Sequence, residues 1–182
     1  MVDAKAIFVD GPNAYHMGRA LGILELRYAS LFRILTREVG NSSSCFGKPV
    51  YVLTPEQAAR KKEVLERSGF EVVAMSTENG KDDAEIVRRI NTLTTDDVSE
   101  IILVSANFKD FQECLQAKSD LGIRVIIVAT KTFNEEGRSM LSVDFDEMRG
   151  EMEFVDLEMF KTRLTRTPLI KNNHLIRTTR RP

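Results

Sequence analysis

The sequence contains few of the residues and segments on which several classes of protein depend. It has only two cysteines, Cys45 and Cys114, which lack the paired spacing of a zinc site and the density of a secreted disulfide scaffold. It has only two histidines, His16 and His174, so we do not expect catalysis by a histidine pair. The amino terminus lacks a basic start followed by a long apolar run, and no later segment reaches transmembrane length. We therefore expect a cytoplasmic protein with reduced thiols and no membrane partner.

Nucleotide-binding motifs are missing as well. The glycines of residues 40–47 have the wrong spacing for a P-loop, and Pro49 stands where a Ser or Thr would bind Mg²⁺. No glycine fingerprint for a dinucleotide is present. A haloacid-dehalogenase-like phosphatase would need a second Asp two residues after Asp10, where this chain has Pro12. We therefore expect no nucleotide cofactor.

Charge is distributed unevenly along the 182 residues. The formal net charge is −1, yet residues 161–182 hold seven Lys or Arg and no acid, which leaves 19 basic and 27 acidic residues in the rest of the chain. Such a basic end can add sequence-independent affinity for a polyanion. The alternative is that it is a solvated, disordered end, which is the interpretation that the composition alone favours. We expect a single domain at residues 1–160 and a flexible basic tail at residues 161–182.

Five short apolar runs without helical periodicity predict buried strands, at residues 6–9, 50–53, 70–75, 101–104 and 123–128. Between them, apolar residues recur at helical spacing, with capping residues such as Thr54 and Gly69. Residues 10–13 are interpreted as a turn. The alternation predicts an α/β fold with three layers: an open, mainly parallel five-stranded sheet with helices on both faces. Beyond Thr130 the pattern weakens to one helix near residues 138–142 and an extended segment near residues 154–157.

Polar residues gather where these predicted strands end. Ligands of open parallel sheets bind beyond the carboxyl ends of the strands. The residues expected there are Asp10, Asn13, Asp83, Ser105, Asn107 and Asp110. Each acid alone also fits an ordinary role, as a turn former at Asp10 or as a first-turn acid that complements a helix dipole at Asp83 and Asp110. Those roles do not explain why three acids share one rim, where a hard divalent cation would relieve their repulsion.

Several blocks of the chain combine residues in a distinctive pattern. Residues 7–13, Ile-Phe-Val-Asp-Gly-Pro-Asn, are an apolar strand followed by Asp-x-x-Asn, which resembles the opening of the NYN family of PIN-like, Rossmannoid nucleases. Residues 81–86 are similar to its Lys-rich turn and Asp, and residues 102–111 resemble its Ser-Gly-Asp-x-Asp-Phe block. Residues 122–128 resemble the Gly and strand that follow. The resemblance spans about residues 5–157, and its first and third blocks are the more specific.

The resemblance implies a metal-dependent ribonuclease that uses Mg²⁺ or Mn²⁺ and has RNA as its partner. On that template the catalytic, metal-binding carboxylates would be Asp10, Asp83 and Asp110. The substrate-binding residues would be Asn13, Ser105, Lys81 and Asn107. The ion would activate a water molecule and stabilise charge on the attacked phosphate.

The chain also departs from the family pattern. Asn107 replaces the first of two aspartates in the third block, and one extra residue precedes Asp110. Ala106 and Asp82 replace glycines, and Arg89 replaces a further acid one and a half turns beyond Asp83. An Asn can ligate a cation through its carbonyl oxygen, whereas an Arg cannot ligate one at all. A catalytically weakened or inactive adaptor that binds RNA or protein on the same fold is therefore the alternative hypothesis.

Residues 154–160 raise the question of a homodimer, because they present apolar side chains late in the chain. These side chains could pack on a second copy or on the protein's own sheet, and the sequence leaves both arrangements open.

Overall fold

The computed structural model describes residues 2–76, 78–132 and 152–165. Its centre is a parallel sheet whose described strands run in the order β4-β3-β1-β5-β6-β7, with the short β2 also pairing with β1. The strands are β1 (Ala4–Asp10), β2 (Ser44–Cys45), β3 (Val50–Leu53), β4 (Glu71–Ala74), β5 (Glu100–Val104), β6 (Arg124–Ala129) and β7 (Glu153–Asp156). This arrangement confirms the predicted mainly parallel α/β fold and adds two strands to the five predicted.

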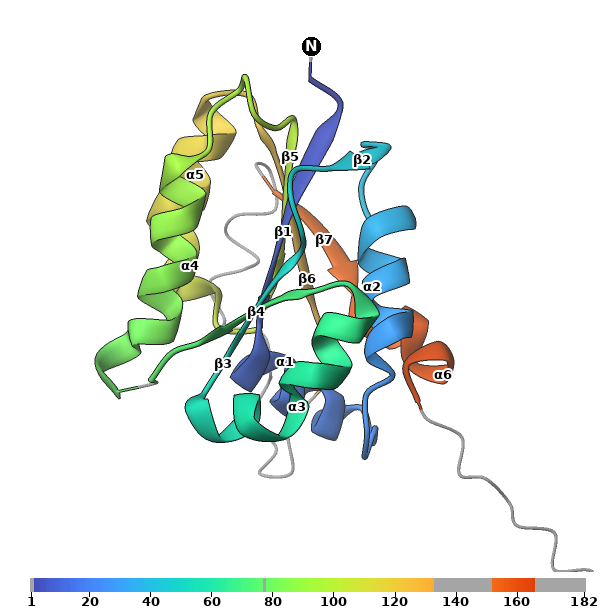
Figure 1. The fold of residues 1–182 in the computed structure, drawn as a ribbon. Helices are drawn as coiled ribbons and strands as arrows, with labels where there is room; N and C mark the ends of the chain where they lie inside the picture. Colours follow the sequence, from blue (N-terminus) through green and yellow to red (C-terminus); the bar gives the residue numbers. More distant parts are fainter. Residues whose placement is uncertain (1, 77, 133–151, 166–182) are drawn as a thin grey trace, which may run out of the picture.

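Helices cover both faces of the sheet (Figure 1). The α-helices are α1 (Gly11–Ala20), α2 (Tyr28–Arg37), α3 (Pro55–Ser68), α4 (Lys81–Thr92), α5 (Gln112–Asp120) and α6 (Lys161–Leu164), and the short 3₁₀ turns are η1 (Glu78–Gly80), η2 (Phe108–Phe111) and η4 (Leu157–Phe160). Figure 1 shows α4 and α5 on one side of the sheet, with α2, α3 and α6 on the other. The central strands are therefore enclosed, and all residues of β1, β3 and β5 are buried.

The order of the strands creates a switch point between β1 and β5. From β1 the chain moves outward through β3 to β4, and it then crosses back through α4 to β5 and continues outward to β6 on the opposite side. The connections at the carboxyl ends of β1 and β5 therefore diverge. In open α/β sheets, the crevice at such a point is where ligands bind.

The segment after β1 differs from the predicted turn. Asp10 caps α1 by accepting a hydrogen bond from the backbone N–H of Asn13, and Pro12 lies in the first turn of the helix, where its missing N–H costs no hydrogen bond. The same residues that favour a turn therefore begin a helix. As a result, Asp10 and Asn13 are held in a fixed relation at the edge of the sheet.

The carboxyl-terminal part of the described chain also departs from expectation. The charge pattern predicts a flexible tail from residue 161, but residues 161–164 form α6, in which Leu164 is fully buried and Arg163 pairs with Glu38, the residue that follows α2. The segment at residues 153–156 forms β7 and pairs with β6, so it packs on the protein's own sheet. The helix predicted near residues 138–142 and the rest of the tail lie outside the described residues. No helix within the described ranges is long and apolar enough to cross a membrane.

Candidate metal centre

Asp10 lies at the carboxyl end of the central strand and is almost completely buried. Its Oδ2 accepts hydrogen bonds from Asn13 Nδ2 at 2.6 Å and from the hydroxyl of Ser105 at 2.9 Å, and its Oδ1 accepts the N–H of Asn13 at 3.1 Å. A carboxylate has about four acceptor positions, so these bonds leave one position open on Oδ1. Asp10 is therefore rigidly oriented, and it retains a lone pair for a further ligand.

Two more carboxylates come from the first turn of α4. Gly80 adopts a left-handed conformation (φ 66°) at the N-cap, and Lys81, Asp82 and Asp83 follow it. One carboxylate oxygen from each of Asp10, Asp82 and Asp83 lies within 4.8 Å of the others. We call these three residues the acid cluster. It joins the end of β1 to the start of α4, two segments separated by about 70 residues of sequence.

The electrostatics of the acid cluster reflect this crowding. Burial, together with smaller contributions from the neighbouring charges of Asp10, Asp82 and Asp110, raises the pKa of Asp83 to about 7. Burial also raises the pKa of Asp10, although the hydrogen bonds from Asn13 and Ser105 oppose the shift. Acids held this close favour protonation unless a positive charge compensates them.

Asp110 belongs to the surroundings of the acid cluster and is not part of the group within 4.8 Å. It lies in η2, where it accepts a hydrogen bond from the side-chain amide of Asn107. The backbone N–H of Asn107 in turn donates to the hydroxyl of Ser105 at 3.1 Å, and that hydroxyl donates to Asp10. A continuous hydrogen-bonded path therefore connects Asp10 to Asp110 across the ends of β1 and β5. Lys81 is exposed at the start of α4.

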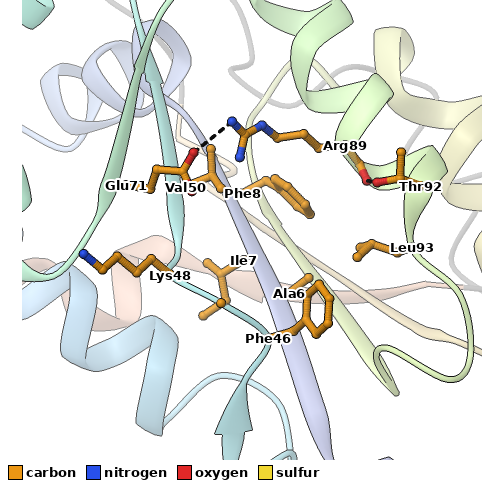
Figure 2. Close-up of a pocket in the computed structure, with 11 residues that line it drawn as sticks. Ala6, Ile7, Phe8, Phe46, Lys48, Val50, Glu71, Arg89, Thr92 and Leu93 are labelled. Atoms are coloured by element: carbon orange, nitrogen blue, oxygen red, sulfur yellow. Dashed lines mark hydrogen bonds and ion pairs between the residues drawn. The ribbon is translucent and has the colours of Figure 1, made fainter.

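Arg89, which replaces a family acid, lies on the same helix but away from the acid cluster. It is six residues beyond Asp83, or about 9 Å further along the helix axis. Its guanidinium pairs with Glu85 at 2.7 Å and with Glu71 of β4 at 2.8 Å. Arg89 and Glu71, joined by their ion pair in Figure 2, line a cavity of about 200 Å³ together with Phe8 and Leu93. Arg89 therefore fastens α4 to the edge strand.

The carboxyl end of α4 is held by Lys118 of α5. The ammonium group of this buried side chain donates to the backbone carbonyls of Asn91 at 3.0 Å and Leu93 at 2.6 Å. A cation at this position satisfies carbonyls that have no partner within the helix and complements the helix dipole. Together, Lys118 and Arg89 fix the helix whose other end presents Asp82 and Asp83.

The donor set of the acid cluster fits a hard divalent cation. All three side chains offer carboxylate oxygens, the ligand type that Mg²⁺ and Mn²⁺ prefer, and two of the three are buried. A bound cation would also offset the burial and the charge repulsion that raise the pKa of Asp83. Among the described residues, the acid cluster is the one group of at least three acids, histidines or cysteines whose ligand atoms all lie within 4.8 Å of one another.

The structure brings together two of the three predicted ligands, Asp10 and Asp83, and adds Asp82. Reasoning from sequence did not select Asp82, because it occupies the place of a family glycine and adjacent residues on a helix point about 100° apart. The signal that was available is the pair of acids in one first turn, directly after a glycine. Because α4 begins at the edge of the sheet, both acids of its first turn can reach the same point.

Comparison with known proteins agrees with this architecture. A family model described as the NYN domain matches residues 5–146. The search of the curated proteins gives no match. The crystal structure of a protein of unknown function from Vibrio parahaemolyticus is similar, with a TM-score of 0.61, 20% sequence identity, and coverage of 85% of this chain and 92% of that one. At this identity the likeness concerns the fold alone.

Proposed function

Since the chain belongs to the NYN domain family, we propose that it is a ribonuclease whose acid cluster holds Mg²⁺ or Mn²⁺ and cleaves RNA phosphodiester bonds. The fold is nuclease-like, and a carboxylate cluster lies at the switch point of its sheet. The observation that carries the proposal is the convergence of Asp10, Asp82 and Asp83 within 4.8 Å. Acids that only stabilise the start of a helix would not be expected to lie this close to a buried acid at the end of a strand.

In this mechanism each residue has a defined task. Asp10, Asp82 and Asp83 would hold the cation, whose chemistry is activation of water and stabilisation of charge on the attacked phosphate. Asn13 and Ser105 orient the Asp10 carboxylate through the hydrogen bonds described above. Lys81, exposed at the start of α4, would contact a phosphate of the substrate. Asp110 adds negative charge beside the acid cluster, with its carboxylate oriented by Asn107.

The adaptor hypothesis depended on Arg89 and Asn107. Arg89 is engaged by Glu71 and Glu85 away from the acid cluster, so it neither blocks nor neutralises the carboxylates. Asn107 lacks a charge, but Asp82 supplies a carboxylate that the family glycine would not. The ion pairs of Arg89 and the additional carboxylate of Asp82 favour the enzyme over the adaptor. The free thiols of Cys45 and Cys114 support the proposal that the enzyme acts in the cytoplasm.

The proposal is tested by incubating a mixed single-stranded RNA pool with the full chain in Mg²⁺, in Mn²⁺ or in EDTA. Wild type should cleave with a divalent cation and stop in EDTA, and Asp10→Asn should abolish cleavage. Asp120→Asn is the matched control, because Asp120 is an exposed acid at the end of α5. Its cleavage should equal that of wild type.

Two results would count against the ribonuclease. One is cleavage that persists in EDTA and in Asp10→Asn, which would indicate a contaminant or another site. The other is a folded wild-type protein that binds RNA but leaves it intact with every cation, as expected of an adaptor.

A further inference from the structure

Tyr15 is an exposed aromatic residue on the helix that Asp10 caps. Tyr15 is 40% exposed, although aromatic rings generally contribute more to stability when they are buried. The ammonium group of Lys61, from α3, lies over the ring at 5.0 Å from its centroid. The ring of His16 meets it edge-on, with the centroids 5.6 Å apart. A solvent-facing ring is therefore held between two helices with a cation on it.

The position of Tyr15 relates it to the acid cluster. Asp10 is the N-cap of α1, Asn13 lies in the first turn and Tyr15 in the second, about 7.5 Å from Asp10 along the helix axis. Tyr15 therefore lies on the same helix whose first residues orient the Asp10 carboxylate. Other large exposed apolar side chains of the described residues, such as Leu24 and Leu121, lie beyond the ends of α1 and α5.

Lys61 differs from the other cations of its helix. Arg60, Lys62 and Arg67 each pair with a glutamate four residues away along α3. Lys61 has no carboxylate within ion-pair distance among the residues that the structure describes, and it is only partly exposed. Burial, with a smaller contribution from Arg60, lowers the pKa of its ammonium group. A partly desolvated cation without an acid gains more from an incoming anion than a solvated, paired one does.

We propose that Tyr15 and Lys61 form a binding subsite for single-stranded RNA, in which a base stacks on the Tyr15 ring and an adjacent phosphate pairs with Lys61. The proposal rests on the ribonuclease function proposed above, and it names how the substrate is held next to the acid cluster. Proteins that bind single strands without sequence preference combine stacking rings with cations that follow the backbone. A ring and a cation in contact supply both elements from two neighbouring helices.

Binding is measured with a fluorescently labelled single-stranded RNA and the full chain in EDTA, so that cleavage does not interfere. Tyr15→Ala should weaken binding about tenfold, whereas Tyr15→Phe keeps the ring and should bind like wild type. Lys61→Ala should lower the slope of log affinity against log salt by about one, because one phosphate contact is lost. Lys62→Ala is the matched control, since its exposed side chain pairs with Glu66, and it should leave the slope unchanged.

A second measurement does not depend on a destabilising variant. The chain has three tyrosines and no tryptophan, and Tyr51 is buried while Tyr28 is partly buried. RNA should therefore quench the tyrosine fluorescence of wild type, and Tyr15→Phe should lose most of that quenching while still binding.

The outcomes separate this subsite from the ribonuclease proposal. Unchanged affinity in Tyr15→Ala, or equal salt slopes for Lys61→Ala and Lys62→Ala, overturns the subsite even if wild type cleaves RNA. Loss of affinity for an acidic protein partner without any effect on RNA overturns it as well and assigns the surface to protein binding. Wild type that neither binds nor cleaves RNA overturns both proposals.

Discussion

Asp83 shows most clearly what the convergence of acids does to a single side chain. Its pKa is raised to about 7, first by burial and then by the charges of Asp10, Asp82 and Asp110. The folded protein therefore holds a proton at Asp83 over a pH range in which the unfolded chain has released it. Without a cation, the free energy of unfolding should fall as pH rises from about 4 to about 7.

The variant Asp83→Asn removes this pH dependence. In EDTA at pH 8, its Tm should exceed that of wild type by about 2 to 5 °C, because a charge that is partly buried and repelled by its neighbours is gone, and the difference should shrink at pH 5. Thermal melts at the two pH values measure it, with Asp120→Asn as the control for loss of an exposed acid. A Tm difference that is equal at pH 5 and pH 8 would show that Asp83 is an ordinary surface acid.

The start of α1 determines where Asp10 points, and Gly11 is the residue that permits it. A Cβ at Gly11 would lie 2.3 Å from the backbone oxygen of Val52 and 2.6 Å from Leu53 Cδ2, so α1 approaches β3 more closely than any side chain allows. At Gly18, on the same helix, a Cβ would make ordinary contacts with Leu26 at 3.5 Å or more. The two glycines therefore have different roles in one helix.

Replacing each glycine by alanine tests this difference. Gly11→Ala should destabilise the protein by about 1 to 3 kcal/mol and weaken Mn²⁺ binding, because α1 must shift and carry Asp10 with it. Gly18→Ala should be neutral or stabilising by up to about 1 kcal/mol, since alanine favours helix. Denaturant unfolding and Mn²⁺ titration measure both effects. Equal stability of the two variants would refute the close approach at Gly11.

The elements that could be predicted from sequence are those with a strong apolar period and clear caps. The strands at β1, β3, β5 and β6 and the helix α3, with Thr54 at its N-cap and Gly69 at its end, lie close to their predicted positions. The two-residue β2 was missed because a polar Ser-Cys pair carries no periodic pattern. Helix α1 was missed because Asp, Pro and Asn favour both turns and helix starts, and only the packing of α1 against β3 decides between them.

The candidate site was predictable only to the level of the strand ends. Asp10 and Asp83 follow from the rule that ligands bind beyond the carboxyl ends of parallel strands. Asp82 does not, because the angle at which α4 approaches the sheet depends on distant contacts such as Lys118 with the end of α4 and Arg89 with β4. Sequence spacing cannot supply that angle.

Across the whole molecule, the end of the domain lies later than the charge pattern predicts. Leu164 is fully buried and its carbonyl accepts the N–H of Arg27, so the first residues of the basic segment belong to the folded body. Five of the seven basic residues lie beyond Thr165. Stability and polyanion affinity should therefore be separable by two truncations.

Deleting residues 166–182 should leave the Tm close to that of the full chain and reduce the salt dependence of RNA binding, because five cations are lost. Deleting residues 161–182 should in addition lower stability by about 1.5 to 3 kcal/mol, the contribution of one fully buried leucine. Thermal melts and binding at several salt concentrations give both quantities. An unchanged salt slope in the shorter deletion would mean that the basic end does not contact RNA.

The most direct test is a calorimetric titration of Mn²⁺ into metal-free protein, because the proposed ribonuclease needs three carboxylates that act as one binding site. Wild type should bind Mn²⁺ saturably. Asp10→Asn and Asp82→Asn should each weaken binding about tenfold or more, whereas Asp110→Asn should weaken it less, since Asp110 lies outside the group within 4.8 Å. Binding that is absent in wild type, or that is equal in wild type and Asp10→Asn, would show that the acid cluster is not a metal site.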